Sequence, residues 1–159
     1  MTASSYAITP IGEINGTFGD FTISLAPEYR DGLTGLEEFS HAWVLWWSHN
    51  ADSPAERQRL VEPRPYTGST GDVGVFGSRS PTRVNPISLT LIMITGLDLE
   101  AGVVRTPFID TDPGTPVIDI KPYFQAIDRV NEVRMPGWAK DWPDSVEASA
   151  SFDWAAAFK

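Results

Sequence analysis

The sequence predicts an all-β domain, built as a barrel or a sandwich. Several short segments alternate apolar and polar side chains with a period of two, which is the pattern of β-strands. Glycine and proline are frequent, with 13 of each among 159 residues, and they mark turns between such segments. No segment shows a helical pattern of three full turns, so a doubly wound sheet with a dinucleotide-binding turn is not expected.

The first two strands are expected at residues 6–14 and 21–25. In the second segment, apolar residues alternate with threonine and serine, so that one face of the strand is apolar. Gly16 and Gly19 lie between the two segments and predict a turn.

Residues 41–49 show the strongest strand pattern. Alternation divides their side chains between two faces, with His41, Trp43, Leu45, Trp47 and His49 on one and Ala42, Val44, Trp46 and Ser48 on the other. Both faces are largely apolar, so this strand is expected in the middle of the sheet. We expect the face of Trp43 and Trp47 to belong to the core rather than to form a platform that stacks on adenine.

The later strands are expected at residues 87–97, 102–109 and 117–120. Near the end of the chain, Asp144 or Ser145 is expected to cap a short final helix. We therefore expect a β domain over residues 1–135, followed by a C-terminal tail, residues 136–159, whose short helix packs on that domain.

Composition narrows the classes of function and site. The net charge is −9, and nucleic-acid-binding proteins ordinarily need a basic surface, so this charge lowers the expectation of a polyanionic partner. Cysteine is absent, which excludes disulfides, thiolate zinc sites and a cysteine nucleophile. His41 and His49 lie at opposite ends of one strand, roughly 26 Å apart at about 3.3 Å per residue, so no metal site is expected.

Two features concern the location of the protein. The N-terminal segment lacks a basic stretch followed by an apolar core, so no secretory signal is expected. The apolar runs are far too short to span a bilayer. We therefore expect a cytoplasmic protein with no membrane partner.

Three long motifs follow one another along the chain. They are GLEEFSHAWVL at residues 35–45, GVFGSRSPTRVNPISL at residues 74–89 and PGTPVIDIKPY at residues 113–123. Together with ITPIGEI at residues 8–14, they resemble the signature of the TrmO/TsaA-like family. The resemblance covers about residues 8–123 of the chain.

The resemblance implies both a fold and an activity. The implied fold is a small, mostly antiparallel β-barrel of the TrmO/TsaA-like type with short peripheral helices, which forms a homodimer. The implied activity is methyl transfer with S-adenosyl-L-methionine as the cofactor. Characterised members of the family methylate the exocyclic nitrogen of threonylcarbamoyl-adenosine beside the tRNA anticodon, so tRNA is the implied partner.

Site residues follow from the same motif match. The cofactor is expected to contact His49, Asn50, Arg79, Leu89, Ile109, Asp110, Thr111 and Asp112. Arg83 and Asn85 are expected to bind the substrate. The expected catalytic residues are Asp119, Lys121 and Tyr123, whose alternate spacing places them on one face of an extended segment.

The chemistry of these side chains suits methyl transfer, which needs in-line positioning and exclusion of water more than acid or base help. Arg79 could hold a carboxylate through two parallel hydrogen bonds. Asn85 offers donors and acceptors to an adenine edge. Purely structural roles are the alternative: Arg79 and Arg83 could brace the Pro-rich loop through its carbonyls, Asn85 could be a turn residue, and Asp119 with Lys121 could form a structural ion pair.

One departure from the family pattern leaves the activity open. Family members carry Arg-Ser-Pro after the first strand and then a longer loop that reaches the cofactor, whereas this chain has only NGTFGD at residues 15–20. One wall of the cofactor site is therefore expected to be altered or lost. The alternatives are a methyltransferase that acts on a small molecule, a non-catalytic ligand-binding or regulatory barrel, and a barrel that uses S-adenosyl-L-methionine for another reaction.

Overall fold

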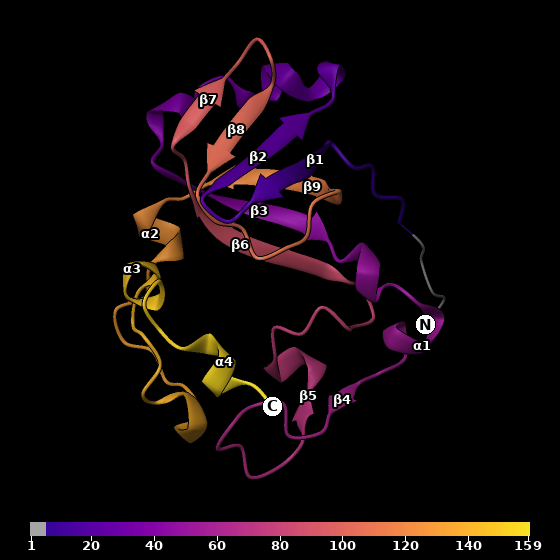
Figure 1. The fold of residues 1–159 in the computed structure, drawn as a ribbon, viewed down its shortest axis with the longest axis vertical. Helices are drawn as coiled ribbons and strands as arrows, with labels where there is room; N and C mark the ends of the chain where they lie inside the picture. The colour runs from indigo at the N-terminus through magenta and orange to yellow at the C-terminus, as the bar shows by residue number, and fades with distance from the viewer. Residues whose placement is uncertain (1–5) are drawn as a thin grey trace. The chain divides into compact units, whose positions relative to one another are not determined.

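The computed structural model describes residues 6–159, and contacts divide the chain into two compact units (Figure 1). The sheet unit comprises Met1–Asn50 and Pro86–Phe124, and the loop unit comprises Ala51–Asn85 and Gln125–Lys159. This division differs from the boundary expected after residue 135. The packing of the tail on the β domain stays a prediction.

The sheet unit is built on seven strands. They are β1 (Gly12–Thr17), β2 (Asp20–Leu25), β3 (His41–Trp47), β6 (Ile87–Met93), β7 (Gly96–Asp98), β8 (Val103–Thr106) and β9 (Thr115–Pro122). Their order is β6-β3-β9-β1-β2-β8-β7, and every pair is antiparallel. The predicted all-β, antiparallel class and the inner position of β3 are confirmed.

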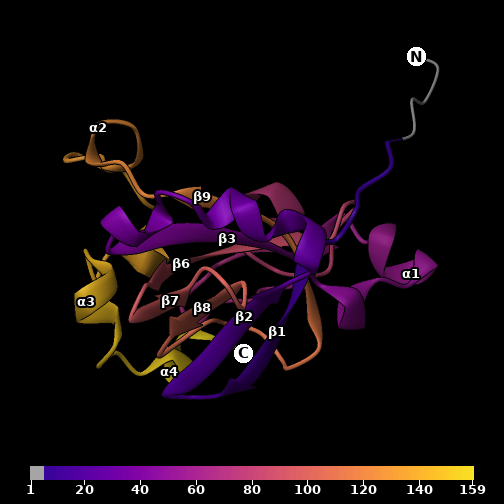
Figure 2. The same cartoon turned by 90° about the horizontal axis from the view of Figure 1, so that it is seen from above.

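The two edge strands of this sheet are consecutive in the chain. Only Ile94 and Thr95 separate β6 from β7, so the sheet must curl until its two edges come within reach of one short linker. Figures 1 and 2 show the result, with β1, β2, β7 and β8 lying across β3, β6 and β9. Within residues 6–159, no hydrogen-bonded ladder pairs β6 with β7, so the sheet is not closed between these two strands.

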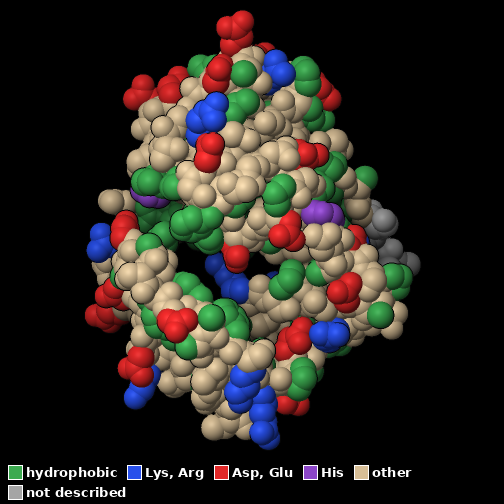
Figure 3. Space-filling model, viewed as in Figure 1, with side chains coloured by type: hydrophobic (Ala, Val, Ile, Leu, Met, Phe, Trp, Pro, Cys, Tyr) green, Lys and Arg blue, Asp and Glu red, His purple; other side chains and the backbone are tan. Residues whose placement is uncertain are grey.

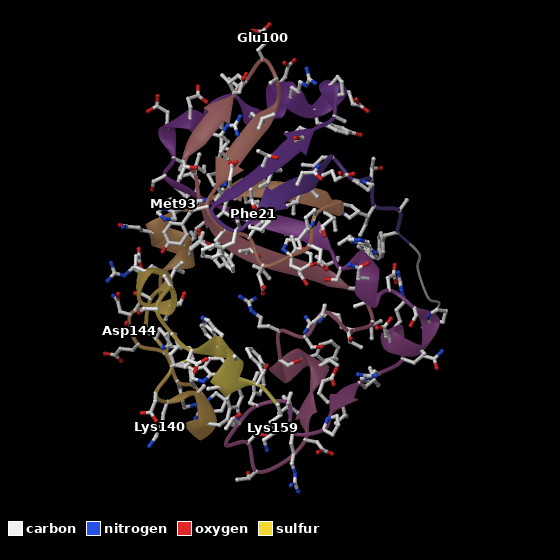
Figure 4. The ribbon with its side chains drawn as sticks, in the orientation of Figure 1. Phe21, Met93, Glu100, Lys140, Asp144 and Lys159 are labelled. Carbon is white, nitrogen blue, oxygen red and sulfur yellow. The ribbon has the colours of Figure 1, made fainter. Side chains whose placement is uncertain are left out.

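The core of the sheet unit is mostly aliphatic and lies on the concave side of the curl. Its buried members come from six strands, from the 3-10 helices η1 (Pro27–Leu33) and η2 (Leu36–Glu38), and from Ile109 in a loop. In Figure 4, Phe21 points into this interior, whereas Glu100 stands at the tip of the turn between β7 and β8. The prediction for the Trp43 face was wrong: the opposite face of β3, with Ala42, Val44 and Trp46, is the buried one. Both faces are apolar, so alternation alone does not choose between them.

Three strand boundaries also differ from expectation. The first strand begins at Gly12 rather than at residue 6, because Pro10 lacks the amide that a ladder needs. The turn after it is the two-residue Phe18-Gly19 hairpin, and Gly16 lies inside β1. The segment predicted at residues 87–97 is interrupted after Met93 and changes partner from β3 to β8.

The loop unit has little regular structure. It contains the helices α1 (Pro54–Arg57), α2 (Gln125–Asp128), α3 (Val146–Ser149) and α4 (Trp154–Ala157), the 3-10 turns η4 (Val75–Gly77) and η5 (Gly137–Ala139), and the paired strands β4 (Val61–Glu62) and β5 (Val73–Gly74). Ser145 caps α3 as predicted, but α3 is only one turn long and Asp153 caps a second helix, α4. No helix among the described residues is long and apolar enough to cross a membrane.

Aromatic rings take the place of an aliphatic core in the loop unit. The aromatic cluster consists of Tyr66, Trp138, Trp142, Phe152, Trp154 and Phe158. Tyr66 stacks on Trp138 with ring centroids 4.1 Å apart. The backbone ties the same segments together, since Thr67 N–H donates to the Ala157 carbonyl at 2.9 Å and Lys159 N–H donates to the Pro65 carbonyl at 3.2 Å.

Candidate cofactor and substrate site

Two of the predicted cofactor segments meet at the end of β3. Asn50 Nδ2 donates to Asp112 Oδ2 at 3.1 Å, although 62 residues separate them in the chain. Both side chains are exposed, and the second carboxylate oxygen of Asp112 is not used by this bond. The structure therefore brings His49 and Asn50 close to the turn that contains Ile109, Asp110 and Thr111.

Threonine hydroxyls hold that turn in shape. Thr115 Oγ1 donates to the Asp112 carbonyl at 2.7 Å and lies 2.7 Å from Thr111 Oγ1. A hydroxyl has one proton, so Thr111 must be the donor in the second bond. The buried Ile109 side chain and the bond from Gly114 N–H to the Ile14 carbonyl, at 2.7 Å, anchor the turn on the sheet. Asp110 and Asp112 are thereby exposed on a fixed backbone.

Thr115 is a residue that the sequence analysis missed. Its side chain is 1% exposed, and its hydroxyl orients the segment that carries Asp112. A signal was present, because Thr115 stands inside the third motif beside a glycine and two prolines.

The expected catalytic residues share one face of the sheet. In the register of β3 and β9, Asp119 lies opposite Leu45, and Lys121 lies opposite Trp43. The register shifts between Leu45 and Trp46, which indicates a bulge in β9 near residue 118. A bulge turns the following side chains to the other face, and here it brings Asp119 to the half-buried outer face rather than to the core.

The expected catalytic residues are also linked by direct contacts. Lys121 Nζ lies 2.7 Å from Asp119 Oδ2, while Asp119 Oδ1 accepts from Ile120 N–H at 2.9 Å. The hydrogen bond and the charge of Asp119 raise the pKa of Lys121, so its ammonium stays charged at neutral pH. Beyond the strand, the ring of Tyr123 packs edge-on against His41, and its N–H donates to the His41 carbonyl at 3.0 Å.

Leu89 belongs to the same face as the Asp119–Lys121 pair. It lies opposite Leu45 in the ladder between β3 and β6, so Leu89, Leu45 and Asp119 form one row across three strands. The Leu89 side chain is 40% exposed. The sheet unit therefore presents an apolar outer face with one ion pair at its β9 side.

Arg79, Arg83 and Asn85 belong to the loop unit, whereas the other predicted site residues belong to the sheet unit. Arg83 is committed to its own loop: Nε donates to the Ser80 carbonyl at 2.9 Å, and Nη2 donates to the Val75 and Ser78 carbonyls at 2.6 and 2.8 Å. Nη1 is the nitrogen that these bonds do not use, so contact with a substrate through it stays a prediction. Arg79 and Asn85 are exposed.

Charge is distributed unequally between the two units. The sheet unit has three Lys or Arg and eleven Asp or Glu, which gives −8, whereas the loop unit has nine and ten, which gives −1. Figure 3 shows the same trend on one face of the molecule, where Lys and Arg side chains gather mostly over the loop unit. The sheet unit therefore favours cationic ligands, and the loop unit repels anions least.

The segment that lacks the expected Arg-Ser-Pro is a tight hairpin. Thr17 pairs with Asp20, and only Phe18 and Gly19 lie between them. A Cβ on Gly16 would lie 2.2 Å from the Asp20 carbonyl oxygen, so the two strands approach closely here. Residues 15–20 thus form a compact end of the sheet and no extended loop.

Comparison with known proteins gives consistent similarities. Residues 8–129 match the tRNA-methyltransferase O N-terminal domain family. An S-adenosyl-L-methionine-binding protein of Archaeoglobus fulgidus is 39% identical over 74% of this chain and 81% of that protein. A tRNA (adenine(37)-N6)-methyltransferase of Homo sapiens is 39% identical over 69% of this chain but only 23% of that protein. The crystal structure of TrmO superposes with a TM-score of 0.68 and 30% identity, over 83% of this chain and 64% of that one.

Proposed function

The chain belongs to the family of the tRNA-methyltransferase O N-terminal domain, and from this premise we propose that it is an S-adenosyl-L-methionine-dependent methyltransferase. We propose an adenosine of tRNA as the acceptor, in the threonylcarbamoyl form that the family resemblance implies, with its exocyclic nitrogen receiving the methyl group. The observation that carries the proposal is the Asn50–Asp112 bond, because it joins two segments that are 62 residues apart in the chain and that the family resemblance assigns to the cofactor. The names of the archaeal and human relatives support the same cofactor and acceptor.

The donors and acceptors that are present fit this cofactor. S-Adenosyl-L-methionine supplies a methyl group on a positively charged sulfonium. The carboxylates of Asp110 and Asp112 can accept from ribose hydroxyls, and the exposed Arg79 guanidinium can bind the carboxylate of the methionine moiety. The net charge of −8 on the sheet unit also suits a cationic ligand. We assign His49, Asn50, Leu89, Ile109 and Thr111 to the walls of this site.

The outer face of β9 is assigned to the acceptor. A nitrogen that gains a methyl group must lose a proton, and we assign that proton to the Asp119 carboxylate. Lys121 holds this carboxylate in place at 2.7 Å, and its raised pKa keeps it a cation rather than a competing base. We assign Tyr123 and Asn85 to hydrogen bonds with the acceptor.

Three further properties belong to the same proposal. The two edge strands of the curled sheet, β6 and β7, are joined by a linker of two residues. This short linker supports closure of the sheet into a barrel. Homodimer formation and a cytoplasmic location follow the family resemblance and the sequence expectations. Sedimentation velocity on the purified chain tests the dimer.

The hairpin at residues 15–20 favours a second candidate function. Since the Arg-Ser-Pro loop is missing there, a non-catalytic barrel that only binds a ligand is the alternative. A small-molecule acceptor on the same site is the third. Methyl transfer to tRNA excludes the second candidate, and transfer that requires no RNA supports the third.

Calorimetric titration with S-adenosyl-L-methionine tests the cofactor site. We expect Arg79→Ala to weaken binding at least tenfold, about 1.4 kcal/mol. Arg105→Ala is the matched control, because Arg105 is an exposed arginine of the sheet unit with a side chain 58% accessible. The second arm measures transfer of a labelled methyl group to unmethylated tRNA. A folded protein that binds no cofactor at millimolar concentration would overturn the proposal.

A further inference from the structure

Phe76 has the most exposed large apolar side chain of the second motif. It is 88% exposed, whereas its neighbour Val75 is 1% exposed. The 3-10 turn η4 carries both residues, and it directs one inward and the other outward. Exposure of a whole phenyl ring is unfavourable in water, so a ring held outward on a fixed turn is a candidate for contact with a ligand.

The turn that carries Phe76 is fixed by a dense set of hydrogen bonds. The Val75 carbonyl accepts from Ser78 N–H at 3.4 Å, from Ser78 Oγ at 3.3 Å and from Arg83 Nη2 at 2.6 Å. Ser80 Oγ accepts from Thr82 N–H at 3.2 Å and donates to Glu62 Oε1 at 3.3 Å. The stapled loop, residues 75–83, is therefore organised before any ligand arrives, which lowers the entropic cost of binding.

The stapled loop combines an aromatic ring with a cation. Arg79 is exposed three residues after Phe76, and the loop unit carries a net charge of only −1 against −8 for the sheet unit. A polyanion is repelled least by the loop unit. Proteins bind unpaired bases by stacking them on exposed aromatic rings, so Phe76 is suited to contact a base of such a polyanion.

We propose that Phe76 stacks on an unpaired base of an RNA acceptor, and that Arg83 is the positioning residue that holds the stapled loop in shape for this contact. The inference rests on the proposed function, in which the acceptor is tRNA. It gives Phe76 a binding role and gives Arg83 an indirect one. The ligand class is a single-stranded RNA loop.

Binding of a labelled anticodon stem-loop RNA at low salt tests the role of Phe76. We expect Phe76→Ala to weaken RNA binding roughly 5- to 150-fold, which corresponds to ~1–3 kcal/mol of base stacking. Phe76→Trp should retain the affinity, and calorimetry should show unchanged affinity for S-adenosyl-L-methionine in both variants. Phe18→Ala is the matched control, because Phe18 is a comparably exposed phenylalanine of the sheet unit, with 83% of its side chain exposed. The Phe18→Ala variant should bind RNA like the wild type.

The outcomes separate the two proposals. Wild-type RNA affinity in Phe76→Ala, together with intact methyl transfer to tRNA, overturns the inference and leaves the proposed function standing. A wild-type protein that binds the cofactor but neither binds nor methylates RNA overturns the tRNA acceptor and the inference with it.

A double-mutant cycle tests the role of Arg83. Arg83→Lys keeps the charge but loses the planar fork that reaches three carbonyls. We expect it to weaken RNA binding in the wild type and to have little further effect in Phe76→Ala, because the ring that it positions is already gone. Equal losses in both backgrounds would indicate direct contact of Arg83 with RNA and would overturn its positioning role.

Discussion

The two units of this chain are held together by different interactions. The sheet unit depends on antiparallel ladders and an aliphatic core, in which Ile14, Ile23 and Val104 are fully buried. The loop unit depends on ring contacts, helix caps and one arginine that binds three carbonyls. Ladders tolerate many sequences with the right alternation, whereas the loop unit depends on particular side chains. Single substitutions should therefore act locally and strongly in the loop unit.

The largest expected effect is at Tyr66. Its ring is 6% exposed and stacks on Trp138, so Tyr66→Ala should lower the free energy of unfolding of the loop unit by about 3–5 kcal/mol, as for other buried aromatic residues. Hydrogen exchange read by mass spectrometry should show loss of protection at Thr67 and Lys159, whose amides bond across the cluster. Tyr66→Phe keeps the ring and should behave like the wild type. An equal loss of protection in β1 and β2 would contradict the comparison between the units.

The same contrast explains which parts of the fold could be predicted from the sequence. The strand at residues 20–25 and the position of β3 within the sheet follow from alternation, which is a local signal. The contact between Tyr66 and Phe158 joins residues 92 positions apart, and no periodic pattern in the sequence predicts it. The buried face of β3 was assigned wrongly because tryptophans occur on both faces, and only the curl of the sheet decides which face is covered.

The site shows a similar division. The alternate spacing of Asp119 and Lys121 predicted one shared face, and their 2.7 Å contact agrees with it. The bulge that turns Asp119 outward could not be predicted, because it depends on register with β3. The sequence left open whether Arg83 binds the substrate or braces its own loop. The structure shows hydrogen bonds from Arg83 to three carbonyls of the loop, and only the folded loop brings these carbonyls within its reach.

The sheet unit has its own sensitive points, where its backbone approaches itself closely. Gly16 has φ of +110°, and a Cβ there would lie 2.2 Å from the Asp20 carbonyl oxygen. Gly16→Ala should therefore lower the free energy of unfolding by about 1–3 kcal/mol, because the clash of the added Cβ with the Asp20 carbonyl oxygen adds to the strain of a positive φ. The midpoint of unfolding in urea measures this loss. Gly19→Ala is the matched control: its φ is +92°, but no atom lies within 4 Å of the added Cβ. If Gly16→Ala unfolds at the same urea concentration as Gly19→Ala, the close approach of the two strands does not contribute to the loss of stability.

Aliphatic packing should give a smaller but clear contrast between the units. Ile23 is 0% exposed in β2, whereas Ile127 is 79% exposed in α2. Ile23→Val should cost about 0.5–1.5 kcal/mol through the cavity it leaves, and Ile127→Val should stay within roughly 0.5 kcal/mol of the wild type. Chemical denaturation of the two variants side by side measures the difference, and equal midpoints would indicate that Ile23 is not part of a tight core.

The smallest expected effect concerns a helix cap in the loop unit. The Ser53 hydroxyl and the Ser53 backbone N–H hold the pKa of Glu56 below its usual value, in a capping box at the start of α1. A lowered folded-state pKa means that this contribution is fully present above the unfolded pKa, about 4.3, and is lost as the pH falls through the folded value. Titration of the Glu56 side-chain carbons by NMR should show a higher midpoint in Ser53→Ala than in the wild type. Ser145→Ala, which removes the cap of α3 instead, should leave that midpoint unchanged; if both variants shift it equally, the capping box at Ser53 is not the cause.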